Sequence, residues 1–194
     1  MQPVRHLILV MLALLGACTM RSAINTMTSE QDRAFAQEMV SRLRSADAAW
    51  LEQHFDPRLW EQSGKQVAGA PDLFPREPGT TELIGFHVST NMAAGRTERT
   101  KEFSLVTHGG GRWTVTHFRT YSTGGPDKVV QWSVTPHDAP PPELTMIETW
   151  DAAVPWIWAA LVTVLAGVVA LIVWLVRRSR RNREALMGGA PGVR

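Results

Sequence analysis

The stretch from Val154 to Val176, VPWIWAALVTVLAGVVALIVWLV, decides the architecture of this chain because its twenty-three residues carry no charged side chain. At about 1.5 Å of rise per residue it forms a helix of roughly 34 Å, which exceeds the roughly 30 Å hydrocarbon core of a bilayer. The alternative, a buried core helix, would need more surrounding chain than the sequence offers. The sequence therefore predicts one C-terminal transmembrane helix over residues 154–176.

The residues that flank this stretch indicate its direction. Five arginines lie between Arg177 and Arg183, whereas no Lys or Arg lies between Lys128 and the span. The positive-inside rule then predicts a basic cytoplasmic tail over residues 177–194 and places everything before the span outside the cytoplasm. Tryptophans occur at both ends of the span, as is typical of an aromatic belt at the headgroup level: Trp150, Trp156, Trp158 and Trp174.

Residues 1–17 have the pattern of an export signal. A basic start is followed by an apolar run of eleven residues, from Leu7 to Ala17, which is too short to span a bilayer. The run ends in Leu15-Gly16-Ala17-Cys18, which resembles the lipobox of bacterial lipoproteins. That resemblance implies cleavage before Cys18 and lipidation of its thiol. Thr19 would favour release to the outer membrane, but a helix through the inner membrane should hold the protein back. The alternatives are a signal that is cleaved without lipidation and an uncleaved anchor.

Charge is distributed unevenly along the chain. Residues 18–153 contain thirteen Lys and Arg against seventeen Asp and Glu, a net charge of −4, whereas the tail contains six Arg and one Glu, a net charge of +5. The basic excess therefore belongs to the tail and not to a folded module, which argues against nucleic-acid binding. Cys18 is the only cysteine, so an exported chain has no internal disulfide available to it.

Residues 18–153 are long enough for a single domain with one core. We expect a short tether over residues 18–28, the domain over residues 29–138, and a Pro-rich linker over residues 139–153 that runs to the membrane. The domain is expected to belong to the α+β class, with two to three N-terminal helices packed on a twisted four-stranded antiparallel sheet.

The helices are expected in the first half of the domain. Thr28 begins a sequence that resembles a capping box, and an apolar stripe predicts a helix from there to about Arg44. A second helix is expected over about residues 46–54, with a further turn after Pro57. The stretch 63–80 is rich in Gly and Pro and predicts irregular structure.

The strands are expected where the apolar period changes to two, over about residues 82–90, 99–108, 112–122 and 129–136. A two-residue turn at Ala94-Gly95 places Phe86 opposite Phe103 and Ile84 opposite Leu105. A three-residue loop at 109–111 places His117 opposite Phe103 and Val115 opposite Leu105. The loop of the last hairpin can place either Val134 or Thr135 beside Val115, and packing favours Val134. These registers predict that one face of the sheet forms the core under the helices, with the residues Ile84, Phe86, Val88, Phe103, Leu105, Trp113 and Val115.

The candidate pocket residues are His117, Arg119 and Tyr121, which alternate along the third strand and by this register continue the core face to its open end. An imidazole, a guanidinium and a phenol at one pocket have the chemistry to bind an anion or move a proton. The alternative interpretation is a hydrogen-bonded core histidine with the other two side chains at a solvated rim. The six histidines lack HxH or HxxxH spacing, so we expect no metal site, and no motif indicates a cofactor.

The order of these elements resembles a known superfamily. Helices with an Ala46-Asp47-Ala48-Ala49-Trp50-Leu51 step and a Phe55-Asp56 end, a Pro-rich loop and a sheet of hairpins are similar to the nuclear-transport-factor-2-like cone superfamily, and in particular to exported lipoprotein domains of that type. The resemblance implies a helix-lined cone able to hold a small molecule. Members include enzymes, transport adaptors and domains without an activity, so the fold alone does not predict which function applies.

We therefore expect a non-catalytic protein of the bacterial inner membrane, with a periplasmic domain and a cytoplasmic tail. The domain is expected to bind an envelope protein or a small ligand. The first alternative is a cone-fold enzyme centred on His117, with Arg119 and Tyr121 as helpers. The second is a structural subunit of a membrane complex.

Overall fold

The computed structural model describes residues 19–187 except Pro78 and Ala94. It contains two units, a domain that ends at Asp151 and a helical segment that starts at Ala152. The predicted signal peptide, the candidate lipidation site Cys18 and the end of the tail from Gly188 onward lie outside the described residues.

The domain begins with four α-helices and one 3-10 helix, whose bounds are α2 (Met20–Met27), α3 (Glu30–Arg44), α4 (Ala48–His54), α5 (Pro57–Val67) and η1 (Ala70–Leu73). Thr19, Ser29, Asp47 and Asp56 cap the α-helices through their side-chain oxygens. The expected tether is therefore largely helical, as α2. The capping residue of α3 is Ser29 and not Thr28, because the Thr28 hydroxyl donates to Ile24 O at the end of α2.

The prediction of irregular structure over residues 63–80 is wrong in its first half, because α5 continues to Val67 and η1 follows. The reason is burial. Val67 and Ala70 are each 1% exposed and belong to the core, and Ser63 donates to Leu59 O and accepts from the Trp132 indole. Tertiary contacts here outweigh the low helix propensity of Gly64.

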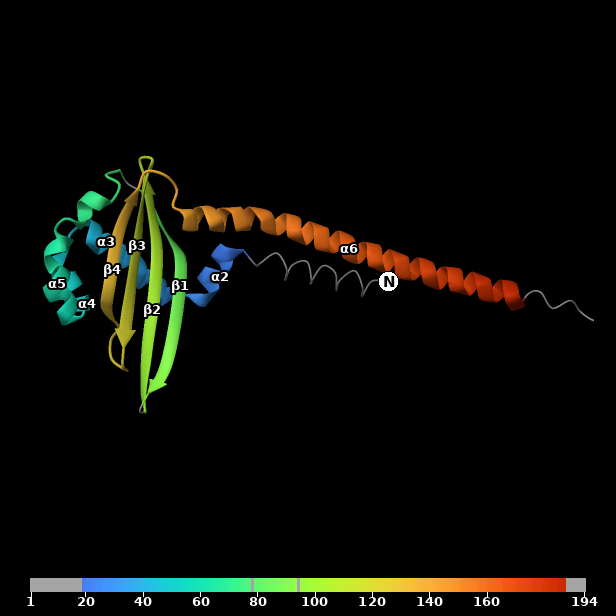
Figure 1. The fold of residues 1–194 in the computed structure, drawn as a ribbon, viewed down its shortest axis with the longest axis horizontal. Coiled ribbons are helices and arrows are strands. Elements are labelled where there is room, and N and C mark those ends of the chain that lie inside the picture. Colours follow the sequence, from blue (N-terminus) through green and yellow to red (C-terminus); the bar gives the residue numbers. More distant parts are fainter. Residues whose placement is uncertain (1–18, 78, 94, 188–194) are drawn as a thin grey trace, which may run out of the picture. The chain divides into compact units, whose positions relative to one another are not determined.

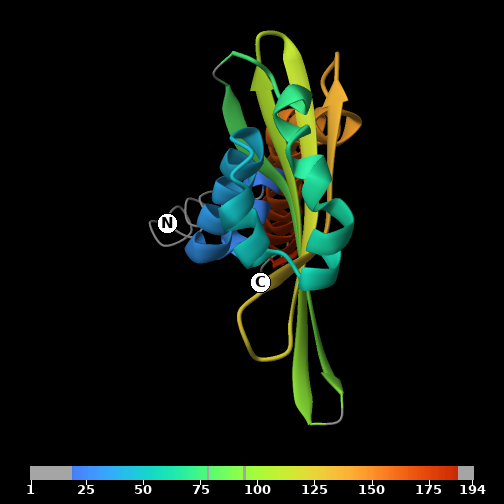
Figure 2. The ribbon, with the colours of Figure 1, turned by 90° about the vertical axis from the view of Figure 1, so that its left-hand side faces the viewer.

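The second half of the domain is a four-stranded antiparallel sheet, as expected, with the strands in the order β1-β2-β3-β4 (Figure 1). The bounds are β1 (Thr80–Ala93), β2 (Arg96–Gly109), β3 (Arg112–Ser122) and β4 (Lys128–His137). Figure 2 shows the helices α3 to α5 in front of one face of the sheet, with the β1–β2 hairpin extending beyond them. We call this face the helix face, and the opposite one the open face.

The register between β2 and β3 differs from the predicted one by one residue. Gly109 pairs with Arg112, so the loop has two residues, Gly110 and Gly111, with φ angles of +56° and +75°. Two successive positive φ values define the tight turn that matches the twist of a hairpin, and glycine adopts them without steric cost. Phe103 consequently lies opposite Phe118 instead of His117.

Two further registers were predicted incorrectly in part. Phe86 lies opposite Phe103, as predicted, but a bulge between Leu83 and Gly85 brings Leu83 opposite Leu105 and turns Ile84 to the open face. In the last hairpin Thr135, the less favoured of the two expected partners, lies opposite Val115. Val134 packs against the core of the helix face instead.

The sheet therefore has apolar residues on both faces. On the helix face the core contains Met39, Leu43, Leu51, Phe55, Phe103, Leu105 and Phe118. A second cluster on the open face joins Ile84, Val106 and Val115 to Leu144 and Ile147, with Ile24 of α2 packed against it. The predicted core face is thus wrong for Ile84, Trp113 and Val115, which belong to or pack against this second cluster, and Val88 is 46% exposed.

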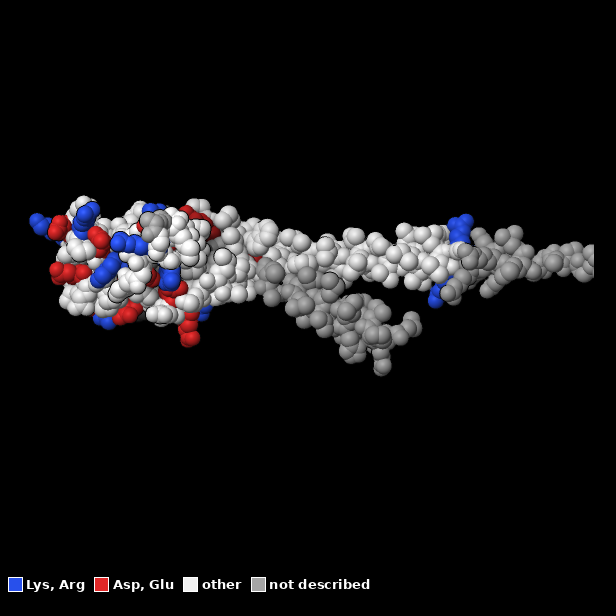
Figure 3. Space-filling view, turned by 90° about the horizontal axis from the view of Figure 1, so that it is seen from below, with Lys and Arg blue, Asp and Glu red and all other residues white. Residues whose placement is uncertain are grey.

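The final helix, α6 (Pro142–Met187), begins earlier than expected and replaces most of the predicted linker. Pro142 can start it because the first helical residue needs no N–H. Its part Pro142–Ser179 is long and apolar enough to cross a membrane. Figure 3 shows no charged side chain along most of the visible face of its apolar stretch.

One ion cluster ties the β1–β2 hairpin to the helices. The Lys101 ammonium is nearly buried on the helix face and lies 2.6 Å from Asp32 Oδ1 of α3 and 2.8 Å from Asp127 Oδ2 of the β3–β4 loop. Burial alone would lower the pKa of Lys101, but hydrogen bonds to Asp127 and Asp32 raise it above its ordinary value of 10.5.

We expect Lys101→Met to lower the free energy of unfolding by about 2 kcal/mol, because it leaves two partly buried carboxylates without their cation. The raised pKa of Lys101 means that its stabilisation is complete at neutral pH and is lost as the pH rises above 10.5. Urea unfolding of the domain at pH 7 measures the effect. The control, Arg119→Met, removes the half-exposed pair with Glu102 and should cost less than about 1 kcal/mol; equal losses would contradict the argument.

Buried threonines of β3 provide a second matched pair. Thr114 and Thr116 are each at most 1% exposed. The Thr114 hydroxyl donates to Leu73 O at 2.6 Å, whereas the Thr116 hydroxyl has no hydrogen-bond partner among the described residues. We expect Thr116→Val to raise the free energy of unfolding by about 1 kcal/mol and Thr114→Val to lower it by about 1 to 2 kcal/mol. Thermal unfolding of the two variants measures the difference, and a loss of stability in Thr116→Val would show that its hydroxyl is satisfied.

Candidate functional site

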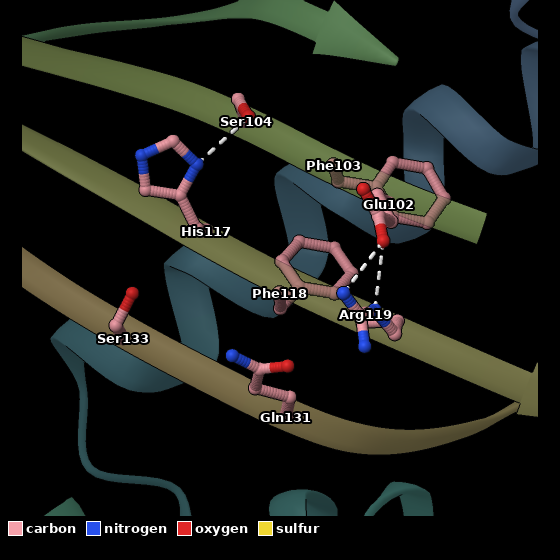
Figure 4. A pocket seen from close by; sticks show the side chains of 8 residues that line it. All are labelled: Glu102, Phe103, Ser104, His117, Phe118, Arg119, Gln131 and Ser133. Carbon is pink, nitrogen blue, oxygen red and sulfur yellow. Dashed lines mark hydrogen bonds and ion pairs between the residues drawn. The ribbon is translucent and has the colours of Figure 1, made fainter. Parts of the chain in front are cut away.

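The candidate site is a shallow hollow on the open face of the sheet, next to the second cluster, whose Val106 and Val115 lie two residues from Ser104 and His117. Its walls come from the middle of β2, β3 and β4, and its volume is about 120 Å³. Side chains alternate along a strand, so every second residue points to this face. The hollow is lined by Glu102, Ser104, His117, Arg119, Gln131 and Ser133, with Phe103 and Phe118 beneath them (Figure 4).

His117 and Ser104 form the first polar pair of the hollow. They are direct partners in the β2–β3 register, and Ser104 Oγ lies 2.8 Å from His117 Nδ1. The pair leaves the second ring nitrogen, Nε2, as the group with which the imidazole can bind a ligand. A cross-strand hydrogen bond of this kind holds the ring in one orientation, which favours a positioned binding group.

Arg119 and Glu102 form the second pair and are also direct partners across β2 and β3. Arg119 Nε and one terminal nitrogen lie 2.8 Å and 2.7 Å from Glu102 Oε1. Both side chains are about half exposed, so solvent screens their attraction and the pair contributes little to stability. Its two charges are accessible to a ligand that brings both a donor and an acceptor.

Tyr121 follows on the same face of β3 but does not line the hollow. It is 36% exposed and lies opposite Thr100. Desolvation raises the pKa of its phenol, and the charge of Glu98 and a hydrogen bond to it act in the same direction. A neutral phenol can donate one hydrogen bond to a ligand and accept another.

The structure thus brings two of the three predicted pocket residues, His117 and Arg119, to one hollow, with Tyr121 further along the strand. It places all three on the open face, because the one-residue change in register turns β3 over relative to the prediction. The sequence analysis missed four other residues of the hollow, Glu102, Ser104, Gln131 and Ser133. The Gly110-Gly111 pair was the signal that could have found them, since a two-residue turn places Ser104 opposite His117.

The hollow contains hydrogen-bond donors and acceptors in similar numbers and one balanced ion pair. Such a surface suits a neutral polar ligand or the polar side chains of a partner protein. Among residues 19–187, as far as they are described, no group of three or more His, Cys, Asp and Glu side chains is arranged to hold a metal ion. Comparison with known proteins found no matching family model, no matching curated protein and no matching solved structure.

Proposed function

We propose that this chain is a protein of the bacterial inner membrane whose domain lies on the periplasmic side and binds a partner without catalysing a reaction. In this proposal α6 crosses the membrane, residues 177–194 form its cytoplasmic tail, and a lipid on Cys18 provides a second anchor. Two anchors confine the domain to a thin layer beside the membrane and raise its effective concentration for partners located there.

The observation that carries the proposal is the meeting of the two ends of the domain. The backbone N–H of Met20, at the start of α2, donates to Asp151 Oδ1 at 2.7 Å. Cys18 precedes Met20 by two residues, which span at most about 7 Å of chain. Val154 follows Asp151 by three residues and begins the uncharged stretch. Cys18 and Val154 are therefore each only two or three residues from the point where the two ends of the domain meet. A lipid on Cys18 and the start of the uncharged stretch of α6 would enter the same leaflet of one membrane.

The hollow on the open face is the surface that we propose for the partner. It combines a positioned imidazole, an accessible ion pair and the hydroxyl and amide of β4 in one depression. The resemblance to cone-fold domains supports a binding role, but the candidate side chains lie on the open face, opposite α3 to α5. We accordingly place the partner on the sheet surface and not inside a cone.

Photocrosslinking tests this proposal in cells that contain the full chain. A photoreactive residue replaces Ser133 in the hollow, and the control replaces Glu52, which is exposed on α4. We expect a discrete adduct from position 133, none from position 52, and loss of the adduct when Arg119→Ala is added. Identical adducts at both positions, or an adduct that survives Arg119→Ala, would contradict a specific site.

The alternative of an enzyme centred on His117 has one observation in its favour, the hydrogen bond between His117 and Ser104. A hydrogen-bonded base and hydroxyl are the elements of nucleophilic catalysis, but the hollow is open to water and offers no second partner that orients the imidazole. A structural subunit of a membrane complex remains the other alternative. A structural subunit would give photocrosslinks from several faces of the domain, whereas the proposed site would give them from the hollow alone.

A further inference from the structure

Exposed apolar side chains lie on the two helices that carry the ends of the domain. Met20 and Met27 of α2 are 36% and 68% exposed, and Met146 and Trp150 of α6 are 59% and 52% exposed. Large apolar side chains in water are unfavourable unless a partner covers them, and a group of them marks an interaction surface. We call these four residues the apolar base.

The apolar base is a separate surface from the second cluster, although both involve α2 and α6. Leu144 and Ile147 of α6 are buried against the open face of the sheet, and Ile24 of α2 packs against the same cluster. Met146 and Trp150 are four residues apart and therefore share one stripe of the helix, distinct from the stripe that is buried. The α6 helix is thus fixed to the sheet by one side and presents another side outward. On α2, Met20 and Met27 share the stripe of Ile24 but lie at the two ends of the helix, where their side chains stay exposed.

We infer that the apolar base docks on the neutral headgroup layer of the bilayer that α6 enters, so that the domain rests on the membrane and does not stand away from it. This inference depends on the proposed membrane anchor. Continuity with the span supports it, because Met146, Trp150 and Ile157 follow at i, i+4 and i+11 and extend the apolar surface of the span toward the domain.

Helix geometry distinguishes a domain that rests on the bilayer from a domain that is only attached to it by the span. Trp150 precedes Val154 by four residues, or about 6 Å along the helix, within a headgroup layer that is roughly 5 to 8 Å thick. Met146 precedes it by eight residues, or about 12 Å, which lies beyond that layer if the helix stands upright. Lipid contact at Met146 therefore requires the domain to lie down on the bilayer.

The charges around the apolar base indicate which lipids it fits. The Arg21 guanidinium lies 2.7 Å from Glu82 Oε1 and 3.8 Å from Glu148 Oε1, and Asp151 accepts from Met20. Two carboxylates thus face the one guanidinium and a third, Asp151, lies at the start of α2, so the local charge is net negative and anionic headgroups gain no attraction here. Contact through Met and Trp side chains with zwitterionic lipid should instead be insensitive to salt, because it buries apolar area and pairs no charges.

The test uses the full chain with Cys18→Ser, so that a single introduced cysteine carries an environment-sensitive fluorophore. The label is placed by Trp150→Cys, Met146→Cys or Met27→Cys, with Met92→Cys at the tip of the β1–β2 hairpin as the control. Met92 is 83% exposed and distant in sequence from the base. Each protein is reconstituted into phosphatidylcholine vesicles that contain brominated acyl chains.

We expect emission at positions 150, 146 and 27 to shift to the blue and to be quenched by the brominated chains, with no change at position 92 and no effect of added salt. Quenching at position 150 with positions 146 and 27 equal to the control would overturn the docking and leave the membrane anchor intact. Absence of quenching at all positions, including 150, would overturn the anchor itself. Quenching that grows with anionic lipid and falls with salt would contradict an apolar contact.

Discussion

Phe103→Ala is expected to lower the free energy of unfolding of the domain by about 3 to 5 kcal/mol. Phe103 is 1% exposed on the helix face, and its ring centroid lies 4.7 Å from that of Phe118 and 5.2 Å from that of Phe86. Truncation removes the transfer energy of the ring and leaves a cavity that its aromatic neighbours cannot fill without leaving their own positions. Since small domains are stable by only about 5 to 15 kcal/mol, this change alone brings the protein close to its unfolding threshold.

The matched control is Val88→Ala, on the neighbouring strand of the same hairpin. Val88 is 46% exposed, so the change should cost less than about 1 kcal/mol. Urea denaturation of the domain followed by circular dichroism measures both values. A small effect of Phe103→Ala would mean that the aromatic cluster between the sheet and α3 does not hold the layers together.

Ending the chain after Asp151 is expected to change its location almost completely. Without residues 152–194 the protein loses most of α6, the helix that is long and apolar enough to cross a membrane, and under the proposed arrangement only a lipid on Cys18 would hold it. We expect this shortened protein to leave the inner membrane for the outer membrane, as the threonine after the cysteine favours. The same truncation with Cys18→Ser should appear in the soluble periplasmic fraction. Membrane fractionation with antibody detection locates the full chain and the two shortened proteins.

Each outcome of this experiment tests a separate anchor. A truncated protein that stays in the inner membrane would show that α6 is not what retains it. A truncated Cys18→Ser protein that remains in a membrane fraction would show that residues 1–17 act as an uncleaved anchor. The core on the helix face lies entirely before Asp151, so both shortened proteins should fold. Their circular dichroism spectra should show both helix and strand.

The positions of the strands could be predicted because alternating apolar residues make a local signal. Bounds for all four strands agree within a few residues, and the pairing of Phe86 with Phe103 followed from a short turn at Gly95. The face to which β3 points could not be predicted in the same way. It depends on whether two or three glycines form the loop, and one residue of difference moves every side chain of the strand to the opposite face. The candidate site moved with it.

The sequence by itself determined the features that arise from local composition: one uncharged stretch of membrane length, a basic end, four strands and the helices that precede them. Only the tertiary structure decided that α2 and the start of α6 both pack on the open face, that Met20 meets Asp151, and that His117 pairs with Ser104 on the face opposite α3 to α5. The physical reason is that apolar periodicity reports how often a side chain is buried. It does not report which distant segment buries that side chain. The choice of segment depends on turn geometry and on contacts between residues far apart in the chain.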